Sequence, residues 1–148
     1  MLTEDLKNIF ERDLNQLIIE IELYKNEQNL WLLNKDIKNS AGNLCLHLIG
    51  NLNHFIGAQL GNTGYIRQRS LEFSLKNVPV SQLKEEIEIT MKVVKDSLSK
   101  LKNEDLVEKY PLEVFGTPMS TQYFLVHLTT HLAYHLGQIN YHRRLLDN

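Results

Sequence analysis

The sequence predicts an all-α protein, a four-helix bundle that forms a single domain over residues 1–148. Three observations carry this prediction. Four amphipathic segments of similar length follow one another along the chain, and no segment shows the strict alternation that is typical of a strand. A chain of 148 residues is also long enough to bury most of its apolar surface around one core.

The first two predicted helices are marked by candidate caps and by apolar residues at three- and four-residue steps. We expect the first helix over residues 3–27, with Thr3 as its N-cap. Its apolar positions are Leu6, Phe10, Leu14, Leu17, Ile21 and Tyr24. The second helix begins at Ser40 and is expected to dissolve in the glycine-bearing stretch 57–64.

The third predicted helix follows Pro79, with Ser81 as its cap, and the fourth follows Ser120 and runs to the C-terminus. The connections at 61–80 and 103–119 are long enough to travel the length of a bundle. Long connections of this kind make an up-down-down-up arrangement possible, and we expect that arrangement here.

Composition excludes several classes of protein. Sixteen basic against eighteen acidic residues give a net charge of −2, which offers no electrostatic reason to bind nucleic acid or an anionic membrane. No apolar stretch approaches the roughly 20 residues of a membrane span, and the acidic start does not resemble a signal peptide. The single cysteine, Cys45, is expected in the core. We therefore expect a cytoplasmic protein with neither a nucleic-acid nor a membrane partner.

Histidines form a ridge on each of two predicted helices, at the edge of the face that the apolar residues turn toward the core. The positions are His47, Asn51 and His54 in the second helix, and His127, His131 and His135 in the fourth. Two histidines four residues apart can bind one ion from the same side of a helix, as in the HExxH motif. The pattern predicts a divalent transition-metal site in the bundle core, with a third ligand from the facing helix. Imidazole suits several such metals, so ligand type alone does not choose among them.

Three neutral imidazoles leave a coordination position open to water or substrate, which is typical of a catalytic rather than a structural metal site. His142 lies near the same line on the fourth helix. Because it is close to the chain end and beside two arginines, we expect it to be a surface or interface residue.

The motifs HLIGNLNHFIG and HLAYHLGQI resemble the DinB/YfiT-like superfamily of four-helix-bundle metalloproteins. The resemblance covers nearly the whole chain, including the NLWLL, NSAGNL and GYIRQRSLEFS segments. It implies that His47, His131 and His135 hold Ni or Zn. His127 with His131 is the alternative pair, and either His127 or His54 is then a residue that supports the ligands.

The resemblance also implies a function. Members of the superfamily act as thiol S-transferases that conjugate bacillithiol-type thiols to electrophiles, others were proposed as metal-dependent hydrolases, and homodimers are common. Neither histidine motif contains an acid that would serve as a hydrolytic base, so we favour thiol transfer. A metal-dependent hydrolase and a non-catalytic metal-binding or dimerisation protein are the alternatives.

Several other residues are candidates for supporting or substrate-binding roles. Gln138 and Asn51 lie one turn after candidate ligands and can orient ligands or substrate. Arg67 and Arg69, with Tyr65 beside them, can hold a carboxylate or phosphate of a small-molecule substrate. For the two arginines, surface salt bridges with acids such as Glu72 are the reading we favour. The sequence identifies no catalytic residue.

Overall fold

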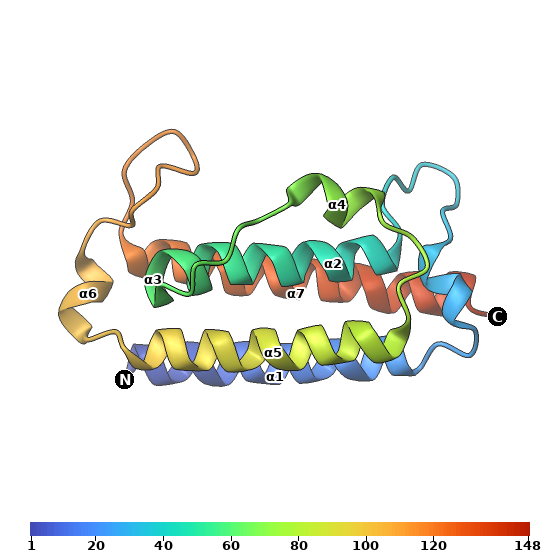
Figure 1. The fold of residues 1–148 in the computed structure, drawn as a ribbon, viewed down its shortest axis with the longest axis horizontal. Coiled ribbons are helices and arrows are strands. Elements are labelled where there is room, and N and C mark those ends of the chain that lie inside the picture. Colours follow the sequence, from blue (N-terminus) through green and yellow to red (C-terminus); the bar gives the residue numbers. More distant parts are fainter.

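The computed structural model describes residues 1–148 and contains helices but no β-strand, which confirms the all-α prediction. Four long helices lie side by side along the longest axis of the molecule (Figure 1). They are α1 (Leu2–Glu22), α2 (Ala41–Leu52), α5 (Val80–Ser99) and α7 (Thr121–Leu146). Because α1 and α2 each pack against both α5 and α7, the four helices enclose one cluster of buried apolar side chains.

The first helix differs from the prediction at both ends. It begins at Leu2 with no side-chain cap, so Thr3 is not the cap, and it ends at Glu22 rather than at residue 27. The chain leaves the helix because the carboxylate of Asp147 accepts the backbone N–H groups of Lys25, at 2.7 Å, and Asn26, at 3.2 Å. A short 3₁₀-helix, η1 (Glu27–Trp31), follows this turn.

The second helix begins at Ser40, which caps α2, and ends within the glycine-bearing stretch 57–64, both as predicted. Between α2 and its end at Gly61 the chain runs through a π-helix, η2 (Asn53–Ala58), and α3 (Gln59–Gly61). Gly57 lies inside this helical stretch and Gly61 ends it, and α5 packs closely against both. A Cβ atom at Gly57 would lie 2.8 Å from Cγ1 of Val93, and one at Gly61 would collide with the Ser97 side chain.

The connection between α3 and α5 passes back along α2 and carries the short helix α4 (Arg69–Ser74) (Figure 1). Asn43, in the first turn of α2, holds this connection through two hydrogen bonds. The Asn43 amide nitrogen donates to the backbone oxygens of Glu72, at 2.9 Å, and Leu75, at 2.8 Å. These two hydrogen bonds hold the backbone of α4 against the start of α2.

Of the caps predicted for the last two long helices, the cap of α7 is confirmed and the cap of α5 is wrong. Pro79 is the N-cap residue of α5, and Ser81 lies in the first turn without the expected role as cap. Ser120 caps α7 as predicted, since its hydroxyl accepts the backbone N–H of Tyr123 at 3.1 Å. The connection between α5 and α7 contains α6 (Asn103–Val107).

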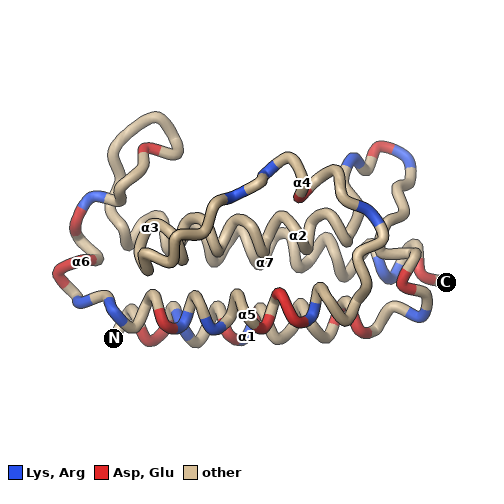
Figure 2. The backbone as a smooth tube through the Cα atoms, in the orientation of Figure 1, with Lys and Arg blue, Asp and Glu red and all other residues tan.

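The helix α2 differs from α1 and α5 in charge and in burial. Figure 2 shows charged residues along α1 and α5 and on the connections, whereas α2 contains none, and all twelve of its residues are buried. An uncharged helix enclosed on every side suits a bundle in which α2 carries a buried polar site rather than a solvated face. None of the helices combines the length and the apolar character that crossing a bilayer requires.

The close approach of α3 to α5 predicts opposite effects for two glycine-to-alanine substitutions. Gly61→Ala forces a methyl group against Ser97, and we expect it to lower the free energy of unfolding by about 1–3 kcal/mol. Gly137→Ala, on the exposed face of α7 with no atom within 4 Å of the added methyl, should raise it by roughly 0.5–1 kcal/mol. Urea unfolding of both variants beside the wild type checks this pair, and equal effects would contradict it.

Candidate metal site

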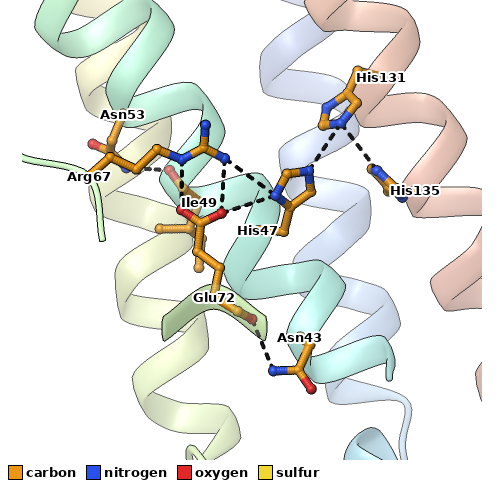
Figure 3. Close-up of polar contacts among 8 residues, drawn as sticks. All are labelled: Asn43, His47, Ile49, Asn53, Arg67, Glu72, His131 and His135. Atoms are coloured by element: carbon orange, nitrogen blue, oxygen red, sulfur yellow. Dashed lines mark hydrogen bonds and ion pairs between the residues drawn. The ribbon is translucent and has the colours of Figure 1, made fainter. Parts of the chain in front are cut away.

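Three imidazoles from two helices meet in the interior of the bundle. Nε2 of His131 lies 3.2 Å from Nε2 of His47 and 3.2 Å from Nε2 of His135 (Figure 3). One ring nitrogen from each residue falls within 4.8 Å of the others, so this three-histidine group can hold a metal ion. His47 comes from α2, and the other two residues stand one turn apart on α7.

The hydrogen bonds behind two of these rings fix which nitrogen faces the centre as an acceptor. Nδ1 of His47 lies 3.0 Å from Oε1 of Glu72. A carboxylate only accepts hydrogen bonds, so Nδ1 carries the proton and Nε2 presents a lone pair. Nδ1 of His135 lies 2.7 Å from Oε1 of Gln138, which sets the same tautomer.

His131 completes a donor set that suits a cation. Its Nδ1 is buried and has no hydrogen-bond partner. Its Nε2 faces the lone pairs of both neighbouring rings, and one N–H cannot satisfy two acceptors in good geometry. A divalent cation bound by all three Nε2 atoms would relieve this conflict, since neutral imidazole is a common ligand of Zn, Ni, Cu and Fe.

Glu72 is the residue that supports the group from outside. Arg67 binds its carboxylate with two hydrogen bonds, Nε to Oε2 at 2.8 Å and Nη2 to Oε1 at 2.9 Å (Figure 3). Gly50 makes room for this carboxylate on α2, because a Cβ atom there would collide with it. The side chains of Arg67 and Glu72 are only 12% and 7% exposed, so the pair belongs to the interior.

The pKa values favour neutral imidazoles beside an ionised carboxylate. Burial lowers the pKa of His131 to about 3, and the neighbouring His135 and His47 act in the same direction. Burial also lowers the pKa of His135. For Glu72, burial acts to raise the pKa, but the hydrogen bonds from His47 and Arg67 outweigh it and hold the pKa below its ordinary value. Neutral imidazole is the form that binds a metal.

An open cleft of about 250 Å³ adjoins the group on the side of His47 and His131. Besides these two histidines, its wall includes four residues that the sequence singled out, Asn51, Arg67, Arg69 and His127, together with aromatic side chains. The His127 ring stacks on Phe124 with centroids 5.7 Å apart, and His127 is not a member of the three-histidine group. The cleft gives a small molecule access to the group from this side.

The remaining candidates occupy different surroundings. His54 packs edge-on against Phe55 and lies outside the three-histidine group. Asn51 is 5% exposed, and its Oδ1 has no hydrogen-bond partner. The Arg69 guanidinium lies 5.1 Å from the Phe73 ring centroid and forms no ion pair, so it is free to bind an anion. Tyr65 lines a separate groove that does not include any of the histidines.

Two expectations about charged and polar residues need correction. Arg67 does pair with Glu72, but the pair is buried and contacts a histidine, so it is not a surface salt bridge. His142 was expected to be a surface or interface residue, and the expectation of a surface residue is wrong, since His142 is 8% exposed with a buried Nδ1 that has no partner. Its helix, α7, packs against η1, and His142 lines a cavity together with residues 34–39.

Sequence reasoning missed the supporting role of Glu72. The chain does contain a signal for it, because Glu72 follows Arg67 by five residues on the segment that returns over α2. Gly50, within the motif HLIGN, is the second part of this signal, since a small residue one turn after a candidate ligand leaves space for a partner. Neither residue identifies the contact without knowledge of how α4 lies on α2.

Loss of the carboxylate behind His47 should weaken metal binding. We expect Glu72→Gln to lower the affinity for Zn or Ni by about 10- to 100-fold, because an amide neither fixes the tautomer nor raises the basicity of the imidazole as a carboxylate does. Competition with a chromophoric chelator measures this affinity. Glu88→Gln, on the exposed face of α5, is the matched control. Unchanged affinity in a folded Glu72→Gln protein would contradict the assigned role.

The depressed pKa of His131 predicts that the metal-free protein loses stability in mild acid. Unfolded His131 binds a proton below about pH 6.5, whereas the folded residue stays neutral until about pH 3. The free energy of unfolding should therefore fall as the pH drops from 7 to 5. His131 contributes about 1 kcal/mol of this loss, half the unscreened maximum, since the ring is partly exposed. Urea unfolding of His131→Gln at both pH values should show a smaller fall, and an equal fall would refute the assignment.

Comparison with known proteins places this fold and this histidine group in one family. The model of the family described as "Protein of unknown function (DUF1572)" matches residues 2–148. No curated protein matches the chain. The match includes α2 and α7 with all three histidines, together with the returning segment that carries Glu72. Since it spans nearly the entire sequence, the protein belongs to the DUF1572 family.

Proposed function

We propose that this protein is a metal-dependent enzyme that transfers a small thiol to an electrophilic substrate. The observation that carries the proposal is the convergence of three imidazole Nε2 atoms beside an open cleft. The metal we propose is Zn or Ni, held by His47, His131 and His135. The low-molecular-weight thiol and the electrophile are then the partners of the protein.

Three protein ligands support an enzyme over a protein with a purely structural metal. A structural zinc site is closed by four protein ligands, whereas a site with three keeps a position for substrate. The nearest further histidine on α7, His127, has its ring centroid 6.2 Å from that of His131 and belongs to the wall of the cleft. This favours catalysis over the non-catalytic alternative.

Thiol transfer is a reaction that such a site can promote. When bound, the ion would lower the pKa of a thiol and present it as a nucleophile near neutral pH. In the overall reaction an S–C bond forms, the bond between carbon and the leaving group breaks, and the thiol proton departs with that group. Arg69 can bind a carboxylate of the electrophile, and Asn51 offers the only buried amide in the cleft wall that lacks a partner for its oxygen. Phe55 and Phe124 contribute apolar side chains to the wall of the cleft.

The surroundings of Glu72 argue against hydrolysis as the first choice. A hydrolase needs a carboxylate near the open coordination position to take a proton from water. Both oxygens of Glu72 are bound by Arg67 and His47, and they lie behind the His47 ring at Nδ1 rather than at Nε2. The carboxylate therefore orients a ligand and is not placed to act as a base.

The resemblance of both histidine motifs to the DinB/YfiT-like superfamily is a further support for metal binding and for thiol chemistry. We propose an up-down-down-up arrangement for the bundle. In Figure 1 the chain runs in one direction through α1 and α7 and in the opposite direction through α2 and α5, which supports this arrangement. We also propose that the protein forms a homodimer, because homodimers are common in that superfamily.

Metal analysis and a conjugation assay test the proposed function together. We expect one equivalent of Zn or Ni in protein purified without chelators, and loss of that metal in His131→Ala. The metal-loaded protein should conjugate bacillithiol, glutathione or coenzyme A to a fluorogenic electrophile, and His131→Ala should reduce the rate by at least about 100-fold. His54→Ala, outside the three-histidine group, is the control that should retain both metal and activity.

Two results would count against the proposal. A metal-free wild type would remove the basis for any metal-dependent activity. A metal-loaded protein that conjugates none of these thiols would refute the transferase function, and ester hydrolysis by the same preparation would turn the assignment to the hydrolase.

A further inference from the structure

A second and larger cavity lies on the other side of the three-histidine group. It has a volume of about 790 Å³ and extends between the connection 34–39, the start of α2 and the C-terminal half of α7. His135 contributes to its wall, whereas His47 and His131 contribute to the wall of the smaller cleft. Its volume falls within the range of roughly 300–1,000 Å³ that is usual for small-molecule sites.

Hydrogen-bonding groups without partners line this cavity along α7. Neither ring nitrogen of His142 makes a hydrogen bond, although the residue is only 8% exposed. Gln138, one turn earlier, uses its amide oxygen on His135 and leaves its amide nitrogen free of protein acceptors. A buried polar group without a partner is costly, so Nδ1 of His142 favours a bound molecule that supplies one. The amide nitrogen of Gln138 is available as a further donor.

The charge of the wall indicates the chemistry of that ligand. Lys35 and Lys38 lie on the connection 34–39, and neither forms an ion pair within the chain. Asp36 is the one acidic side chain in the wall. In the sequence Asp36 stands between these two lysines, and Figure 2 shows both basic and acidic residues on the connection that precedes α2. The cavity wall therefore carries more ammonium and amide donors than carboxylate acceptors. Such a wall favours a ligand that bears a carboxylate, because a carboxylate accepts hydrogen bonds from these donors.

We propose that this cavity binds the carboxylate-bearing part of a small-molecule substrate, through Gln138, His142 and the ammonium groups of Lys35 and Lys38. Under the proposed function, on which this last step rests, that substrate is the thiol. The thiol then approaches the three-histidine group from the His135 side. The electrophile occupies the cleft on the side of His47 and His131, so that neither substrate has to displace the other.

The position of Gln138 connects the cavity with the metal site. Its amide oxygen accepts from Nδ1 of His135 at 2.7 Å, and Gln138 also lines the cavity with its amide nitrogen free of protein acceptors. A carboxylate that accepts a hydrogen bond from that nitrogen polarises the amide and strengthens the bond to His135. Gln138 is in this sense a positioning residue between the bound ligand and one of the three imidazoles.

Calorimetric titration with a ligand pair that lacks the thiol tests the cavity without relying on metal or on turnover. S-methylglutathione carries two carboxylates, and its dimethyl ester has neither. We expect the full-length protein, metal-loaded or chelated, to bind the acid more tightly than the ester by about tenfold or more. Lys38→Glu, at an exposed position, and His142→Gln should each abolish this preference while the metal content stays that of the wild type.

Lys95→Glu makes the same change of charge on the exposed face of α5 and is the control, which should keep the preference for the acid. Equal affinity of the wild type for acid and ester would overturn the proposal, and so would a preference that persists in both Lys38→Glu and folded His142→Gln. A protein that keeps the preference but conjugates no thiol would support the carboxylate site and refute the proposed function. The two failures are thus distinguishable.

Discussion

The hydrogen bond between His47 and Glu72 is the contact on which the geometry of the site depends. It joins the uncharged, fully buried helix α2 to the short helix α4, and it fixes the tautomer of the one imidazole that faces α7 from α2. A buried carboxylate is tolerable only when its charge is compensated. Arg67 supplies that compensation, Gly50 supplies the space, and Asn43 holds the backbone of α4 in place.

The same constraint explains the long connection between α3 and α5. A short loop would join the two helices but could not lay a carboxylate along the outer side of His47. The returning segment places Arg67 and Glu72 there, and it leaves Arg69 at the edge of the cleft. On α7 the support is simpler, because Gln138 reaches His135 from the next turn of the same helix. One imidazole is thus oriented by tertiary structure and another by helical periodicity.

That difference also decides how much of the molecule could be predicted from its sequence. Features governed by local spacing were accessible: the helical segments, the caps Ser40 and Ser120, and the histidine ridge on α7. Features set by packing between distant segments were not. Glycine predicts the end of a helix when only neighbours are considered, yet Gly57 lies inside a helical stretch at a point where Val93 of α5 leaves no room for a Cβ atom. The burial of His142 likewise depends on segments far from it in the chain.

The 84 residues that separate His47 from His131 have a consequence for how metal binding is linked to folding. Neither α2 nor α7 supplies all three imidazoles, so the ligand set is complete only where the two helices have packed together. An unfolded chain therefore has no preformed site, and a bound ion would add its binding free energy to the stability of the folded bundle.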